Sequence, residues 1–193
     1  MNTKELILLK SKELYAQNII SFSMRQLAEA CGIGISVLYY YFKNKNELLK
    51  VAFDTTNTQL GIERSKLPSV SDPRKLLLQR IDFQFEHAQD VIFVLKYFMT
   101  HRPTFEKNAG GYIPEKGYLH IKEVLEVGLK QKLFKIPNID HDAKVITHAI
   151  NGFILEYYPD IPVGKKRNEI INMISSFILR AVATNYQKSS LSL

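Results

Sequence analysis

The feature that most constrains this chain is a short stretch from Met24 to Phe42, MRQLAEACGIGISVLYYYF. Ala28 provides a small side chain where two helices can cross closely. Gly32 follows four positions later, where the chain must turn through a left-handed backbone conformation. Apolar residues stand on both sides of this turn at the offsets that pack two helices together: Leu27, Cys31, Ile33, Leu38 and Tyr41. The stretch therefore predicts a helix-turn-helix.

Periodicity of about 3.6 residues dominates the rest of the chain, and strand-like alternation is scarce. Ser23 opens the second helix as a cap, Pro103 closes the sixth, and Asp140 caps the eighth. The fold class is all-α, with a three-helix head at 1–46 and a helical body at 47–193. About nine helices are expected, over residues 4–17, 24–31, 35–42, 45–66, 73–87, 90–101, 115–133, 140–158 and 165–186.

Composition and charge narrow the class of protein. The formal net charge is +7, and residues 1–50 hold seven Lys and Arg against four Asp and Glu. This basic excess is compatible with a polyanionic partner without requiring one. The single cysteine, Cys31, excludes a disulfide within the chain and favours a reducing compartment. Because no signal peptide and no apolar run of membrane-spanning length is present, we expect a cytoplasmic protein with no membrane contact.

The segment SMRQLAEACGIGISVLYYYFKNKNELL is similar to the signature of TetR-family transcriptional regulators. In that family a Ser- or Thr-led helix and a tight turn precede a short L-Y-x-Y/H-F recognition helix, and K-x-x-L begins the fourth helix. Residues 38–42 and 45–48 match this pattern, and the close match covers about residues 4–50. The resemblance implies a DNA-binding domain at 1–46 and a ligand-binding and dimerisation domain at 47–193.

The resemblance also assigns roles within the head. The third helix is expected to enter the major groove of DNA, with its first exposed residues near base edges. Its tyrosines would reach phosphates or thymine methyl groups, and the lysine that begins the fourth helix would hold a phosphate. The residues expected to contact DNA are Ser23, Arg25, Ile35, Ser36, Val37, Tyr39, Tyr40 and Lys45.

The third helix departs from the family pattern at its start. Gly34 stands where Ser or Thr is usual, and Ile35, Ser36 and Val37 replace a polar or basic residue, Gly and Thr. The side chains of Ile35 and Val37 cannot form hydrogen bonds, so on a base they can contact only the thymine methyl group. We therefore expect the operator to be recognised more through the shape and backbone of the DNA than through hydrogen bonds to its bases. The departures also leave an alternative open: a helical protein–protein adaptor with a degenerate DNA-binding head.

Four consecutive aromatic residues, Tyr39 to Phe42, follow in the same helix. Four consecutive residues span most of a helix circumference, so at least one of them must face outward. We expect Tyr41 and Phe42 inside, and Tyr39 and Tyr40 exposed.

The body is rich in aromatic residues, which fit either a helical core or the lining of a pocket. The family resemblance favours a pocket for a small apolar or aromatic ligand whose identity stays open. The residues expected to line it lie on central helices or at their ends: Phe83, His87, Tyr97, Phe98, Met99 and Phe153.

The last two helices carry broad apolar faces. In the family, such helices pair with their copies across a two-fold axis, so we expect a homodimer whose heads meet successive major grooves. The residues expected at the interface are Ile146, Ile150, Ile154, Ile174, Ile178 and Ala181.

The sequence contains no pattern that indicates catalysis. The five histidines lack the spacing of a metal site, and phosphate-binding glycine loops and nucleophile motifs are missing. We expect no metal, no cofactor and no enzymatic activity. The hypothesis is a TetR-type regulator, a repressor that binds a palindromic operator as a dimer and is released by a small-molecule ligand.

Overall fold

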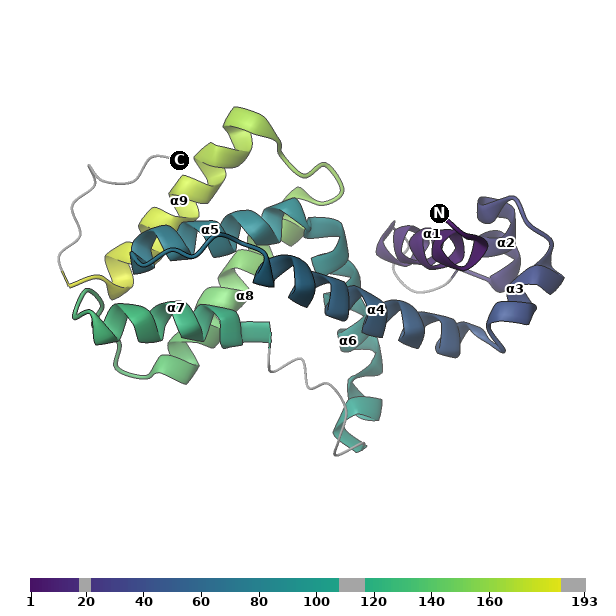
Figure 1. Cartoon of the computed structure of the whole chain (residues 1–193), viewed down its shortest axis with the longest axis horizontal. Coiled ribbons are helices and arrows are strands. Elements are labelled where there is room, and N and C mark those ends of the chain that lie inside the picture. The colour runs from purple at the N-terminus through teal and green to yellow at the C-terminus, as the bar shows by residue number, and fades with distance from the viewer. Residues whose placement is uncertain (18–21, 108–116, 185–193) are drawn as a thin grey trace. The chain divides into compact units, whose positions relative to one another are not determined.

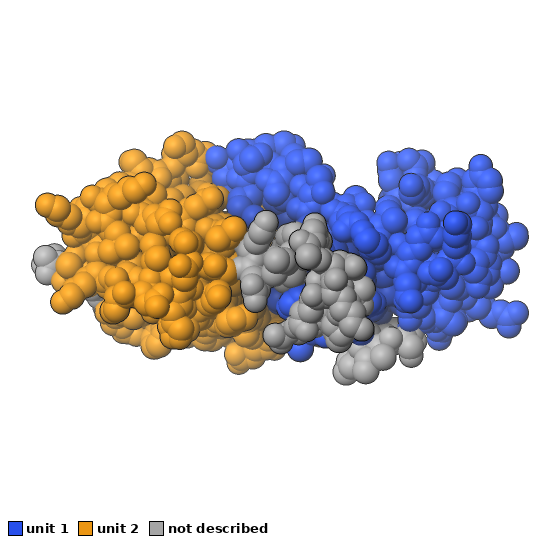
Figure 2. Space-filling model, turned by 90° about the horizontal axis from the view of Figure 1, so that it is seen from below, with its two compact units in different colours: residues 1–67, 89–108 blue, residues 68–88, 109–193 orange. Residues whose placement is uncertain are grey.

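The computed structural model describes residues 1–17, 22–107 and 117–184. Nine helices and no β-strand make up these residues, which confirms the all-α fold class. The helices fall into two compact units, shown in blue and orange in Figure 2. Unit 1 holds residues 1–67 and 89–108, and unit 2 holds residues 68–88 and 109–193.

Unit 1 consists of five helices, labelled in Figure 1, whose buried side chains form one core. These are α1 (Thr3–Gln17), α2 (Met24–Cys31), α3 (Ile35–Tyr41), α4 (Lys45–Ser65) and, from its second residue on, α6 (Ala88–Lys107). The core side chains with no more than 1% exposure include Ile7, Leu27, Leu38, Phe53 and Phe93. Each of the five helices contributes one of them, so the head is continuous with α4 and α6.

Helix α6 contacts α1 through an aromatic ring pair, an ion pair and a hydrogen bond. The ring of Phe93 meets Tyr15 of α1 edge-on at 5.6 Å between centroids. The Lys12 ammonium pairs with the Asp90 carboxylate at 2.6 Å, and the Lys96 ammonium donates a hydrogen bond to the carbonyl oxygen of Ala16. The two polar contacts join residues 78 and 80 positions apart in the chain, so helix periodicity gave no sign of them.

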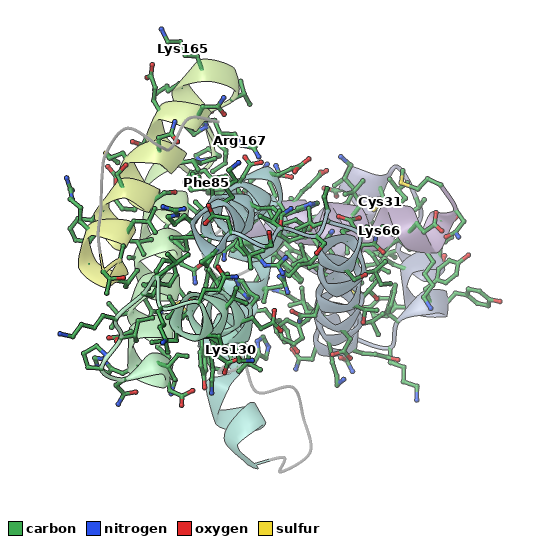
Figure 3. The ribbon with its side chains drawn as sticks, turned by 60° about the vertical axis from the view of Figure 1, so that its left-hand side comes forward. Cys31, Lys66, Phe85, Lys130, Lys165 and Arg167 are labelled. Carbon is green, nitrogen blue, oxygen red and sulfur yellow. The ribbon has the colours of Figure 1, made fainter. Side chains whose placement is uncertain are left out.

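Unit 2 consists of α5 (Pro73–Glu86), α7 (Leu119–Lys130), α8 (Ile139–Tyr157) and α9 (Gly164–Val182). Helix α5 packs on α7 and α9, and α7 packs on α8. The Arg167 guanidinium of α9, labelled in Figure 3, donates hydrogen bonds to the Asp82 carboxylate at 2.6 Å and to its backbone carbonyl at 2.9 Å. This double contact to a charged partner fixes α9 against α5.

Several helix boundaries differ from the sequence prediction, among them the end of α6 and the start of α8. Helix α6 continues past Pro103 to Lys107, because a proline removes one backbone donor without necessarily ending a helix. Helix α8 is capped by Asn138, whose side-chain oxygen accepts a hydrogen bond from the His141 N–H at 3.1 Å. Asp140 instead pairs with the Lys122 ammonium of α7 at 2.8 Å. None of the helices in the described residues is long and apolar enough to cross a membrane.

Candidate nucleic-acid interface

Helix α2 begins with a reciprocal cap. The Ser23 hydroxyl accepts from the Gln26 N–H at 3.2 Å, and the Gln26 side-chain oxygen accepts from the Ser23 N–H at 2.7 Å. This pair of bonds is a capping box, which satisfies two backbone donors that the helix leaves unpaired, and it confirms Ser23 as the predicted cap. Ser23 and Arg25 both lie exposed at this end of α2.

The turn after α2 is built on Gly32, which has φ 65° and ψ 32°. The Gly32 N–H donates to the Glu29 carbonyl and the Ile33 N–H to the Ala28 carbonyl, each at 3.0 Å. This pair of bonds is a Schellman motif, which ends a helix with a left-handed residue and favours glycine there. Cys31, labelled in Figure 3, is half-buried beside the turn, and burial raises the pKa of its thiol. A thiol with a raised pKa is a poor nucleophile, which suits a packing role.

Helix α3 buries one side and exposes the rest. Leu38 is fully buried and Phe42, which caps the helix, is 2% exposed. Tyr39 is 51% exposed and Tyr40 is 83% exposed, which confirms the prediction for both tyrosines. Tyr41, predicted inside, is only partly buried and packs against the edge of the core. The first turn of α3 is open as well, with Ile35 at 42% and Val37 at 37% exposure.

Lys45 begins α4 close to this exposed helix. Its ammonium lies 4.5 Å from the centroid of the buried Phe22 ring, and desolvation lowers the pKa of Lys45. Asn44 caps α4 by accepting from the Glu47 N–H at 2.9 Å. A cation at the positive end of a helix dipole is electrostatically disfavoured, so an anion such as a phosphate at this point would relieve it. Sequence reasoning missed Phe22, which only its position before the Ser23 cap could have suggested.

The capped helix α2, the turn at Gly32 and the exposed helix α3 together define a class of protein. The helix pair that turns at Gly32 presents a short second helix, α3, whose exposed side chains are mostly apolar and aromatic. Arg25 lies on α2, and Lys43 and Lys45 directly follow α3 in the chain. A short exposed helix of this kind can enter the major groove of DNA, and nearby cations can meet the phosphates. The head is a helix-turn-helix of the DNA-binding type.

Comparison with known proteins names the family. Residues 7–52 match the model of bacterial regulatory proteins of the tetR family. The head of the chain therefore matches the tetR family, and the chain as a whole shares the fold of transcriptional regulators of that family. No curated protein sequence matches it.

Solved structures share the fold over nearly the whole chain. The ketosteroid transcriptional regulator KstR2 of Mycobacterium tuberculosis is 14% identical, with a TM-score of 0.71 over 95% of this chain and 96% of that one. The TetR-family regulator PfmR of Thermus thermophilus is 19% identical, with a TM-score of 0.71 over 93% and 99%. The MbdR regulator of Azoarcus sp. CIB is 16% identical, with a TM-score of 0.65 over 92% and 97%. At these identities the likeness concerns the fold.

The residues predicted to line a ligand pocket are divided between the two units. Tyr97, Phe98 and Met99 lie on α6 in unit 1, whereas Phe83, His87 and Phe153 lie in unit 2. In unit 2 the ring centroids of Phe83 and His87 are 4.4 Å apart.

In unit 1 the predicted ligand residues differ in their surroundings. Tyr97 belongs to the core, 4.5 Å from Phe53 between ring centroids, and burial raises its pKa to about 12. Met99 is 74% exposed. The structure thus gives Tyr97 a packing role, and the other residues stay a prediction.

The residues predicted for dimerisation lie on the inner face of unit 2. Five of the six have at most 7% exposure, and only Ala181 is exposed: the buried ones are Ile146, Ile150, Ile154, Ile174 and Ile178. Side chains that form the core of one protomer cannot also form its contact surface. The five buried residues therefore mark the inward face of both helices. The large apolar side chains that α8 and α9 expose are Val145, Leu155, Met173 and Phe177.

Proposed function

We propose that this regulator is a repressor that acts in the cytoplasm, binds a palindromic operator as a homodimer, and leaves it when a small apolar or aromatic ligand binds. The exposed face of α3 is the observation that carries DNA binding. Tyr40, 83% exposed on a helix held rigidly by Leu38 and Phe42, projects where a groove would receive it. The proposed activity is regulatory and not catalytic.

Within the head, each exposed group has a role on DNA. The hydroxyls of Tyr39, Tyr40 and Ser23 are placed to donate hydrogen bonds to phosphates, together with the charges of Arg25 and Lys45. These contacts fix the orientation of α3 on the duplex. The residues at the start of α3 then meet the base edges.

The double substitution Tyr40→Ala with Lys45→Ala tests the DNA contacts. Both side chains lie outside the fully buried core, so the variant is expected to fold and dimerise while losing operator binding. Binding of the single variant Lys45→Ala should also depend less steeply on salt, by about one unit of slope. The matched control is Lys50→Ala, since Lys50 is an exposed lysine of α4 already paired with Asp54 at 2.6 Å.

Fluorescence anisotropy with a labelled duplex, measured over a range of salt concentrations, reads out both quantities. Near-native affinity of the double variant would refute the contact assignment. Absence of duplex binding by the wild-type protein at low salt would refute the proposed function. That result would favour the adaptor alternative, which the exposed Ile35 and Val37 also suit.

The homodimer is proposed to form through the outward faces of α8 and α9. Met173 and Phe177 lie four residues apart on α9, 49% and 65% exposed, with Glu169 before them and Arg180 after them. If α9 pairs antiparallel with its copy, Met173 meets Phe177 and Glu169 meets Arg180. This arrangement is self-complementary in both shape and charge, as a two-fold interface requires.

Phe177→Glu tests this interface, because it places a carboxylate in the apolar centre of the contact. We expect a shift from dimer to monomer in sedimentation velocity, with far-UV circular dichroism unchanged. Val163→Glu is the control, since Val163 is 78% exposed but precedes α9 and so lies outside the proposed contact of Met173 with Phe177. If the Phe177→Glu protein stays dimeric, the interface does not lie on this face of α9.

Ligand release is proposed to work by population shift, through a ligand that binds better to a conformation with wrongly spaced heads. Helix α4 directly follows the head in the chain, so it is one element that can connect the head to the body. The contacts of α6 with the head support a second connection. Asp90 of α6 pairs with Lys12 of α1, and the Phe93 ring of α6 packs against Tyr15 of α1. A ligand that displaces α6 would thus act on α1 directly.

A further inference from the structure

We infer that α3 reads the methyl group on C5 of pyrimidines in the major groove, so that the operator is recognised through thymine and through 5-methylcytosine in its place. This inference rests on the proposed DNA-binding function. It concerns which chemical group on the base edges supplies sequence specificity.

The first argument is the inventory of side chains that α3 can offer. Residues 33–42 read IGISVLYYYF and include no Arg, Lys, Asn, Gln, Asp or Glu. The bidentate pairs that distinguish guanine and adenine by hydrogen bonds need those residue types. In the first turn of α3 the only side-chain hydrogen-bonding group is the Ser36 hydroxyl.

The second argument is where the apolar side chains point. Leu38 and Phe42 already anchor α3 to the core, and Ile35 and Val37 remain 42% and 37% exposed. Ile35 and Tyr39 are separated by one helical turn, so an apolar and an aromatic surface lie on the same side of the helix. Apolar surface exposed on a groove-binding helix gains free energy only against an apolar partner.

The third argument is the partner itself. The methyl group of thymine is the apolar group that an unmodified B-DNA major groove presents to a protein. Cytosine methylated at C5 carries the same group at the same ring position, whereas uracil and cytosine lack it. Lys43 and Lys45, which directly follow α3 in the chain, and Arg25 on α2 supply the positive charge that the phosphates beside such a groove would attract. The observations therefore favour duplex DNA over an apolar protein as the occupant of this surface.

The experiment begins with selection of bound sites from a randomised duplex library by the full-length protein. Each thymine of a selected half-site is then replaced by uracil, which keeps every hydrogen bond and removes only the methyl group. At contacted positions we expect affinity to fall by about fourfold per methyl, the effect of one buried methyl group. Replacement of that base pair by one containing cytosine should lower affinity further, and 5-methylcytosine should recover part of the loss.

Two protein variants connect this effect to the side chains. Ile35→Ala with Val37→Ala should bind the thymine and uracil duplexes with equal affinity, near that of the wild type on uracil. Ser36→Ala, on the same turn, removes a predicted hydrogen bond and should lower affinity for both duplexes, while the ratio of thymine to uracil affinity stays that of the wild type. Since Ile35, Ser36 and Val37 are all exposed, thermal unfolding should show that the variants fold like the wild type.

The outcomes separate this inference from the function on which it rests. Binding that is specific but equal on thymine and uracil duplexes would overturn the methyl readout and leave DNA binding intact. Discrimination that persists in the Ile35→Ala, Val37→Ala protein would also overturn it. Failure of the wild type to select any duplex would overturn both.

Discussion

A methyl group added at Gly128 would collide with the ring of Phe134. An alanine Cβ there would lie 2.0 Å from Cδ2, 2.4 Å from Cγ and 2.5 Å from Cε2 of that ring. The ring has little room to move, because Phe134 is 3% exposed and its N–H donates to the Gly128 carbonyl at 3.1 Å. The next residue is held as well, since the Lys135 N–H donates to the Val182 carbonyl at 2.7 Å.

The expected cost of Gly128→Ala follows from two opposing effects. Forcing a methylene-sized group into a packed site costs about 1–3 kcal/mol. Alanine recovers up to about 1 kcal/mol of helix propensity relative to glycine. We expect a net loss of about 1–2 kcal/mol in the free energy of unfolding, with a fall in Tm of about 2–4 °C per kcal/mol for a chain of this size.

Urea unfolding followed by far-UV circular dichroism measures this loss. Gly61→Ala on α4 is the matched control, because nothing lies within 4 Å of its added methyl group and the substitution should stabilise the protein. In a Phe134→Leu background, which removes the ring, Gly128→Ala should cost clearly less. A Gly128→Ala protein as stable as the wild type, or a cost unchanged by Phe134→Leu, would refute the reasoning.

Three further predictions concern unit 1. The pKa of Tyr97 is raised to about 12 by burial, so the protein should lose stability as pH rises from about 10 to 12, and Tyr97→Phe should lose less in urea unfolding across that window. Ser23→Ala removes the cap that Gln26 reciprocates and should cost about 1 kcal/mol in thermal unfolding. Lys12→Ala breaks the pair with Asp90 and should cost at most about 1 kcal/mol, seen as faster amide exchange in α1.

The head was predictable because its signals are local. Ser23 and Gln26 satisfy each other across three residues, and Gly32 ends α2 by a motif confined to its immediate neighbours. The exposure of Tyr39 and Tyr40 followed from helix geometry alone once Leu38 was assigned to the core. In each case the structure is determined by interactions between residues that are close together in the sequence.

The outer and inner faces of the last helices were not predictable in this way. Helix α8 carries apolar residues both at Ile146 and Ile150, which are buried, and at Val145 and Leu155, which are exposed. A helix with two apolar stripes has no periodicity that says which stripe meets its own protomer. Only the packing of α8 on α7 decides it.

By itself the sequence determined the all-α class, the turn at Gly32 and the apolar start of α3, because hydrogen-bonding capacity and helix period are properties of residues close together in the chain. Tertiary structure alone decided that α6 shares the core of the head, that Tyr97 packs there, and which faces of α8 and α9 remain open. Those outcomes depend on segments far apart in the sequence, whose contacts form only when the whole core is packed.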